Sequence, residues 1–381
     1  MENKKKDVLL SVKGLSQYFS VEKNFFGKTT RYLKAVDKVS FDLEKGKTMG
    51  LVGESGCGKT TTGRSIIKLY DITDGEVFFQ DKLISKGNFS FKERALEIKN
   101  ELKEVKSDPL KNDLSQKLEE ELKQLKKNIK EASKYKKRDE DTMVDMQIIF
   151  QDPYASLSPR LTVGEIIGEA VKAHKLVSKE EYKDYIINVM KTCGLPSYYY
   201  SRYPHEFSGG QRQRISIARA LALRPKLVIC DEPVSALDVS IQAQIINLLN
   251  DLQSELNLTY IFISHDLSVV EHISDTVGVM YLGNMVEHGT KEQIFKNPLH
   301  PYTEVLLSAV PNPDPKVRMK RIPLTGEIPN PANPPQGCKF HTRCSKCMDV
   351  CKKKVPRILE IEEGHLVACH LYDKDIMGSN K

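Results

Sequence analysis

The chain has 381 residues, of which 40 % are hydrophobic and 29 % charged, and its formal net charge is +7. This composition is typical of a globular chain, and the positive charge by itself selects neither a membrane surface nor nucleic acid. The apolar runs fall short of the roughly 20 residues that cross a bilayer, and residues 1–6 precede no apolar signal core. We therefore expect a cytosolic protein without a membrane span of its own.

Strand and helix signals alternate along most of the chain. In the first part we expect short strands at 8–12, at 41–51 with a turn at 44–46, and at 48–52. A helix is expected at 59–69 and a β-like piece at 75–83. Further on, we expect strands at 146–150, 226–231 and 259–264, alternating with helices at 163–174, 179–193, 209–223 and 241–256. This alternation predicts a parallel α/β sheet.

The segment from about 88 to 142 differs from its surroundings because it is rich in Lys and Glu. A helix-breaking Ser-Asp-Pro at 107–109 predicts two helices in a hairpin. Four leucines are spaced as on one helix face: Leu114, Leu118, Leu122 and Leu125. The segment is either a solvated helical insertion or a docking surface for a partner, and its apolar stripe is too short for a long coiled coil.

A Gly-rich loop follows the strand at 48–52 and fits G-x-x-x-x-G-K-[ST] at every required position. Its glycines let backbone N–H groups wrap a phosphate, and the helix that follows adds its positive N-terminal end. Lys59 can reach the β- and γ-phosphates, and Thr60 can offer a hydroxyl to Mg²⁺. We assign nucleotide binding to the loop and its next residue: Gly53, Glu54, Ser55, Gly56, Cys57, Gly58, Lys59, Thr60 and Thr61.

Two acidic residues follow an apolar strand at 227–230. Asp231 can hold Mg²⁺ through water, and Glu232 is placed to accept a proton from an attacking water. A strand that merely ends in an acidic cap is the structural alternative, and the presence of the Gly-rich loop makes it the weaker reading.

A second anion-binding helix start lies more than 150 residues after the first. It consists of Ser208, Gly209, Gly210 and Gln211. A single nucleotide site needs one such loop, so the second is best explained as serving a site on a partner subunit.

Together these motifs resemble those of the ABC transporter ATPases. The loop at 208–211 resembles their signature, Gln151 their Q-loop, residues 235–238 their D-loop, and His265 their switch histidine. The resemblance covers residues 8 to 290 and implies a P-loop ABC ATPase of the α/β class, with a RecA-like core, an antiparallel β subdomain and an α-helical subdomain. A Cys-rich C-terminal extension would be added to it.

The resemblance also implies roles. The catalytic residues would be Glu232, His265, Gln151 and Asp238, and Mg²⁺ would be held by Thr60, Gln151 and Asp231. ATP would be trapped between two cassettes, each presenting its signature to the other's P-loop. Phe19 would stack on adenine, although packing of Tyr18 and Phe19 in the core is about equally plausible.

Several further stretches resemble the oligopeptide and dipeptide importer ATPases, in particular their F-type subunit. They include the Asp-Pro-Tyr-Ala-Ser at 152–156, the His-Pro-Tyr-Thr at 300–303 and the Cys-rich tail from residue 337. This likeness implies an ATPase that drives peptide import from the cytoplasmic face of the membrane. Its partners would be a D-type ATPase, two permease subunits and, indirectly, a solute-binding protein, with no nucleic acid. The alternatives are the same motor for another solute such as nickel or, less favoured, a soluble ABC ATPase.

Five of the eight cysteines lie between residues 338 and 369. In a reducing compartment such crowding favours a metal or iron–sulfur site over disulfides. The family pattern matches Cys338, Cys344, Cys351 and Cys369, and implies a [4Fe–4S] cluster, while tetrahedral zinc and unligated thiols stay open. Cys347 lies outside the pattern.

These considerations predict an ABC domain over residues 1–297 and an importer-type extension over 298–381. Within the first, the insertion covers about 88–142 and the helical subdomain about 152–223.

Overall fold

The computed structural model describes residues 7–25, 29–105, 112–137, 139–310, 322–323 and 326–377. Its centre is an eight-stranded sheet in the order β11-β12-β10-β9-β3-β8-β7-β6. The bounds of its strands in chain order are β3 Thr48–Val52, β6 Met146–Ile149, β7 Leu227–Asp231, β8 Thr259–Ile263, β9 Thr276–Tyr281, β10 Asn284–Thr290, β11 Leu359–Glu362 and β12 His365–Val367. The strands β6, β7, β8, β3 and β9 run parallel, which confirms the predicted sheet.

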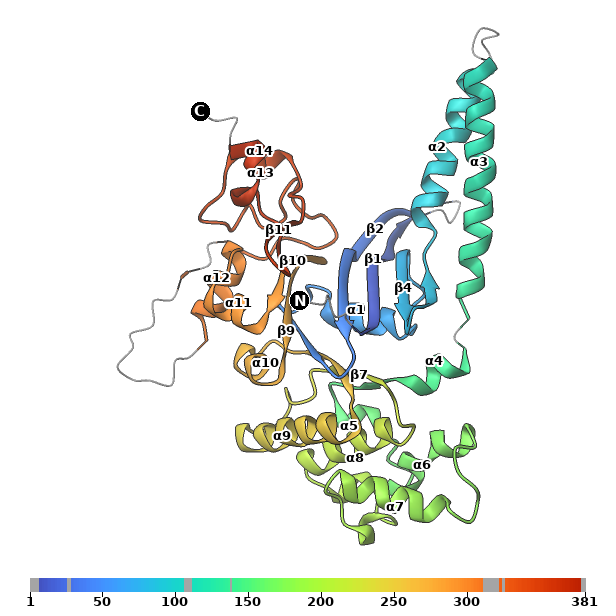
Figure 1. The fold of residues 1–381 in the computed structure, drawn as a ribbon, viewed down its shortest axis with the longest axis vertical. Coiled ribbons are helices and arrows are strands. Elements are labelled where there is room, and N and C mark those ends of the chain that lie inside the picture. Colours follow the sequence, from blue (N-terminus) through green and yellow to red (C-terminus); the bar gives the residue numbers. More distant parts are fainter. Residues whose placement is uncertain are drawn as a thin grey trace, which may run out of the picture.

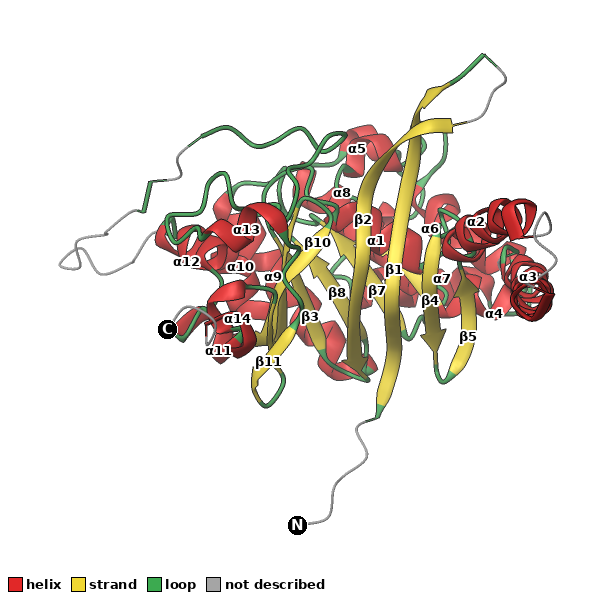
Figure 2. Ribbon diagram, turned by 90° about the horizontal axis from the view of Figure 1, so that it is seen from above, coloured by secondary structure: helices red, strands yellow, loops and turns green. Residues whose placement is uncertain are grey.

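A second, antiparallel sheet has the order β2-β1-β4-β5 (Figure 2). Its strands are β1 Val8–Lys23, β2 Thr29–Glu44, β4 Asp74–Phe79 and β5 Lys82–Lys86. The predicted short strand at 8–12 was wrong in length, because β1 pairs with β2 along nearly its whole course. The single β-like piece at 75–83 was also wrong: Gln80 and Asp81 both have positive φ, as a tight hairpin requires, so the chain turns between two strands.

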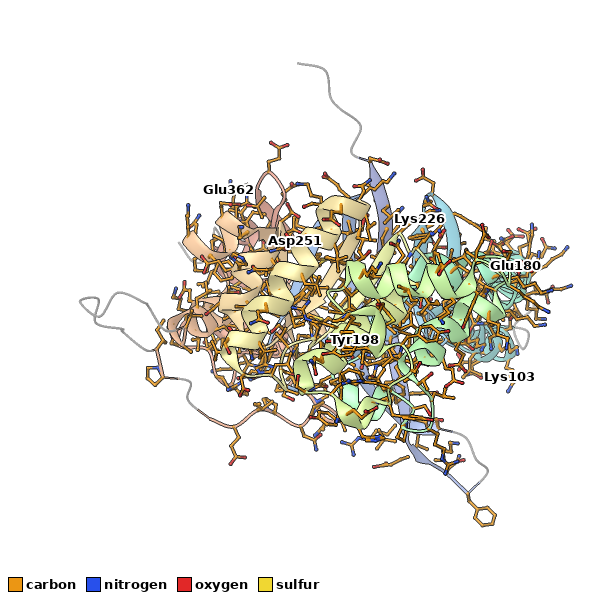
Figure 3. The ribbon with its side chains drawn as sticks, turned by 90° about the horizontal axis from the view of Figure 1, so that it is seen from below. Lys103, Glu180, Tyr198, Lys226, Asp251 and Glu362 are labelled. Atoms are coloured by element: carbon orange, nitrogen blue, oxygen red, sulfur yellow. The ribbon has the colours of Figure 1, made fainter. Side chains whose placement is uncertain are left out.

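The helices around the main sheet are α1 Lys59–Ile66, α9 Val239–Leu256, α10 Leu267–Ile273, α11 Lys291–Lys296 and α12 Pro301–Ser308. The first of them ends three residues before its predicted end at residue 69. Helices α5 Pro153–Ser156, α6 Val163–Ala173, α7 Tyr182–Thr192 and α8 Gly209–Leu221 gather at one end of the molecule with α9 (Figure 1). Helices α5 to α8 are the helical subdomain. Figure 3 shows Tyr198 and Glu180 on its outer surface.

The insertion forms the predicted helical hairpin, α2 Phe89–Val105 and α3 Asn112–Ala132, followed by the short α4 Glu140–Asp145. It stands beside the antiparallel sheet and points away from the helical subdomain (Figure 1). Leu118, Leu122 and Leu125 pack with α2, whereas Leu114 is 47 % exposed. The predicted break at 107–109 lies outside the described residues. Lys103 of α2 points outward from the hairpin (Figure 3).

The C-terminal part shares the main sheet and its core. Glu287 of β10 pairs with Val367 of β12, and the buried Glu287 carboxylate lies 2.9 Å from Nε2 of His365. Helices α13 Asp349–Lys353 and α14 Lys374–Met377 belong to this part.

Burial lowers the pKa of His300 to about 3. The neutral ring therefore accepts a hydrogen bond from the N–H of Tyr302 at its Nδ1 atom and caps α12.

Among the described residues, the helices include none that combines the length and the apolar character needed to span a bilayer. The domain boundary near residue 298 stays a prediction, and the sheet continues across it.

Candidate active site

The backbone of the loop between β3 and α1 packs closely against the backbone of neighbouring segments. Gly53 has φ 146°, and a Cβ there would lie 2.1 Å from the carbonyl oxygen of Met280. Gly58 has φ 107°, and a Cβ there would lie 2.3 Å from the carbonyl oxygen of Ala35. Only glycine fits at both positions. The motif glycines are therefore required by the shape of the loop as well as by phosphate binding.

Lys59 opens α1 with only 5 % of its surface exposed. Its Nζ donates to the carbonyl oxygens of Gly53 at 2.7 Å and Glu54 at 3.1 Å. The ammonium is thus held over the loop, where incoming phosphates can exchange for these carbonyls. Cys57 lies beside it, and burial raises the pKa of its thiol, which fits a small packing residue rather than a nucleophile.

Two of the three predicted Mg²⁺ ligands, Thr60 at the start of α1 and Asp231 at the end of β7, are in direct contact. Thr60 Oγ1 donates to Oδ1 of Asp231 at 2.6 Å, and Arg64 Nη2 donates to Oδ2 at 3.3 Å. Asp231 is fully buried, and that burial raises the pKa of its carboxyl. Hydroxyl, carboxylate and amide oxygens are the donors that Mg²⁺ prefers, so Thr60, Asp231 and Gln151 suit this ion. Arg64 did not stand out in the sequence because no motif marks it.

Two predicted catalytic side chains, Gln151 and His265, meet one carboxylate oxygen of a third, Glu232. Gln151 Nε2 donates to Oε2 of Glu232 at 2.9 Å, and His265 Nδ1 lies 3.3 Å from the same oxygen. Glu232 has φ 47°, a left-handed conformation that costs free energy for a side chain other than glycine. Its N–H donates to Ile263 of β8, which helps to hold this conformation and aims the carboxylate past the end of β7.

The signature residues lie in the helical subdomain, apart from α1 (Figure 1). Ser208 caps α8 and exchanges hydrogen bonds with Gln211, whose Nε2 also donates to Tyr199. A Cβ on Gly210 would lie 2.5 Å from Ile241 of α9. Asp238 is exposed and begins α9, beside Val239 with 82 % exposure. The described hydrogen bonds of the signature side chains thus stay within their own subdomain.

Phe19 is half-buried on β1, with its ring edge-on to Tyr70 at 5.6 Å between centroids. The hydroxyl of the preceding residue, Tyr18, donates to Asp37 at 2.7 Å, so Tyr18 has a hydrogen-bonding role within the fold. The adenine-stacking role of Phe19 stays a prediction.

The charges of the cysteines in the tail, Cys347 included, influence one another. Burial first, and then the charges of Cys351, Cys369 and Cys344, raise the pKa of Cys338 to about 12. Burial likewise raises the pKa of Cys369 to about 11. In the part of the chain that the structure describes, no group of three or more His, Cys, Asp or Glu side chains is arranged to hold a metal ion. Neither the iron–sulfur nor the zinc expectation is therefore established by this geometry.

A Gly-rich phosphate loop, a buried Mg²⁺-type carboxylate with an adjacent glutamate, and a separate signature helix define a P-loop ATPase of the ATP-binding cassette class. The comparisons with known proteins agree. The model of the family "ABC transporter" matches residues 36–235, and that of "Oligopeptide/dipeptide transporter, C-terminal region" matches residues 286–351. The chain belongs to the ABC transporter family, and within it to the oligopeptide and dipeptide transport ATP-binding proteins.

Curated relatives match along nearly the full chain. The oligopeptide transport ATP-binding protein AppF of Bacillus subtilis (strain 168) is 47 % identical, over 96 % of this chain and 98 % of the relative. The dipeptide transport ATP-binding protein DppF of Escherichia coli (strain K12) is 45 % identical, over 96 % of this chain and 95 % of the relative. The resemblance inferred from the motifs is confirmed.

A solved structure supports the fold alone. The structure of cbiO1 from Clostridium perfringens has a TM-score of 0.54 and 23 % identity, and covers 77 % of this chain and 92 % of that chain. The predicted fold class is confirmed, and ATP is bound through the ABC domain.

Proposed function

We propose that this chain is the ATP-hydrolysing subunit of an importer for oligopeptides or dipeptides. The observation that carries the proposal is the arrangement around Glu232, whose carboxylate faces Gln151 and His265 beside the Thr60–Asp231 pair. The similarity to peptide transport ATP-binding proteins over nearly the whole chain supports the cargo class.

In this mechanism the P-loop amides and Lys59 bind the phosphates of ATP and offset their charge. Thr60, Asp231 and Gln151 would hold Mg²⁺, which supplies further charge stabilisation when bound. Glu232 accepts a proton from the attacking water, and Gln151 and His265 orient its carboxylate. The strained backbone at Glu232 keeps the base at the end of β7, so that it need not reorganise during the reaction.

The second half of each ATP site would come from a partner cassette. The exposure of Asp238 and Val239 supports this arrangement, and so does the position of α8, which Ser208 caps, away from α1 (Figure 1). We propose a D-type ATPase as the partner, with two permease subunits and an extracytoplasmic solute-binding protein completing the importer. The chain would then work at the cytoplasmic face of the membrane, without nucleic acid.

Reconstitution tests the proposal. We expect the chain, assembled with its cognate ATPase and permeases in lipid vesicles, to take up peptide when ATP and the binding protein are supplied. Transport would be measured with a labelled peptide, with ADP in place of ATP as the control. ATP-dependent uptake of nickel without uptake of peptide would contradict the cargo assignment, and a complex without ATPase activity would contradict the function itself.

We also propose that Cys338, Cys344, Cys351 and Cys369 ligate a [4Fe–4S] cluster. Burial and the charges of neighbouring thiols raise the pKa values of Cys338 and Cys369, and the match of the four cysteines to the family pattern supports a common site. When bound, such a cluster supplies four Fe–S bonds that would crosslink the extension.

The cysteine at 347 provides a matched control. We expect anaerobically purified wild-type protein to be brown, with about four irons per chain by elemental analysis. Cys351→Ser should lose most of the iron, whereas Cys347→Ser should keep it, because only the former is in the proposed ligand set. Colourless wild-type protein with one zinc per chain would show the proposal to be wrong.

A further inference from the structure

Arg343, in the C-terminal part of the chain, contacts the phosphate-binding loop directly. Its Nη1 donates to Oε2 of Glu54 at 2.8 Å, and its Nη2 donates to Oε1 at 3.0 Å. The two residues are 289 positions apart, and their side chains are only 5 % and 19 % exposed. Such a two-pronged, largely buried pair is among the stronger ionic contacts in proteins and fixes geometry as well as charge.

Glu54 is bound through every one of its polar groups. Its N–H donates to the hydroxyl of Tyr302 at 2.8 Å, its carbonyl accepts from Lys59, and its carboxylate accepts from Arg343. Tyr302 is fully buried on α12 and packs against Phe340, three residues before Arg343. Tyr302 and Arg343, which both lie after β10, thus fix Glu54, and Glu54 in turn accepts a hydrogen bond from the phosphate-binding Lys59.

Charge gives this contact a consequence for ligand binding. Glu54 is the second residue of a loop that binds a polyanion, so an uncompensated carboxylate there would repel the phosphates. Hydrogen bonds from Arg343 to Glu54, above all, raise the pKa of the guanidinium, so it remains a cation whenever the protein is folded. The pair as a whole brings no net charge to the loop.

We propose that Arg343 is a positioning residue for the ATP site: it neutralises Glu54 and, with Tyr302, holds the start of the P-loop in its phosphate-binding shape. ATP affinity is then set in part by the C-terminal extension. This inference deepens the proposed ATPase function and rests on it.

The test measures the affinity of the full-length chain for a fluorescent ATP analogue and the KM and kcat of the assembled transporter. Arg343→Met should weaken ATP binding and raise KM about tenfold, equivalent to about 1.4 kcal/mol, with a much smaller change in kcat. Adding Glu54→Gln to Arg343→Met should restore most of the affinity, because the unpaired carboxylate is then gone. Glu54→Gln alone loses the two-pronged ion pair but leaves a cation beside the phosphates, so it should weaken ATP binding much less than Arg343→Met does.

Lys346 is the matched control, because it forms an ion pair of 2.7 Å with Glu304 of α12 at the surface of the same extension. Lys346→Met should leave ATP affinity unchanged. Equal affinity of wild type and Arg343→Met would overturn the inference, and so would a loss that Glu54→Gln fails to restore, which would indicate general undocking of the extension. If Arg343→Met does not fold, a loss of ATP affinity of about tenfold or more by Glu54→Gln alone would also overturn it. A wild-type chain that does not bind ATP would instead contradict the proposed function.

Discussion

Replacing Glu232 with Gln is expected to keep ATP binding and to reduce ATP turnover at least about a hundredfold. The amide has nearly the shape of the carboxylate and can stay near Gln151 and His265, but it cannot accept the proton of the attacking water. The fold is expected to persist, because the N–H of Glu232, which bonds to Ile263, is unchanged. Single-turnover phosphate release and equilibrium ATP binding would be measured on the same preparation.

Glu271→Gln is the matched control for this substitution. Glu271 is an exposed carboxylate on α10, the helix that follows β8, and it has no contact with the Glu232 cluster among the described hydrogen bonds. Its removal should leave turnover near wild type. Turnover of Glu232→Gln within a few fold of wild type would remove Glu232 from the role of base.

Ser208→Arg is expected to stop hydrolysis at the partner's P-loop, and so to lower ATP turnover of the assembled transporter at least about twofold, while the isolated chain still binds ATP. The substitution introduces a long cation at the start of α8, where the proposed partner-facing loop must approach phosphates closely. It leaves the P-loop of the same chain untouched, because the described hydrogen bonds of Ser208 go to Gln211 and Arg212. Two measurements are therefore needed. ATP binding to the single chain reports on its own P-loop, and the ATPase activity of the complex reports on the site that Ser208 completes for the partner.

Thr162→Arg controls for the loss of a helix cap. Thr162 caps α6 through a capping box with Glu165, as Ser208 does for α8 with Gln211. Each substitution should cost about 1 kcal/mol of folding stability, measurable by denaturant unfolding. Only Ser208→Arg should lower ATP turnover of the assembled transporter. Loss of ATP binding by the isolated Ser208→Arg chain would place the signature in its own chain's site and contradict the shared-site model.

The sequence alone identified the features that are contiguous in the chain. The P-loop, the acidic pair after β7 and the signature are each read within a few residues, because their chemistry depends on local backbone shape and helix starts. The parallel sheet was predictable for the same reason, since buried strands and amphipathic helices alternate with recognisable periods. The glycines of the P-loop then proved necessary for close packing against Ala35 and Met280.

Only the tertiary structure decided which distant residues meet. The full length of β1 came from its pairing with β2, because its outer half carries no clear apolar alternation and gains its hydrogen bonds from the partner strand. The contacts of Arg64 with Asp231 and of Arg343 with Glu54 join residues 167 and 289 positions apart. Such pairs depend on strand order and on where the C-terminal part joins the sheet, which local propensities do not encode, so their role in the ATP site could be seen only in the folded chain.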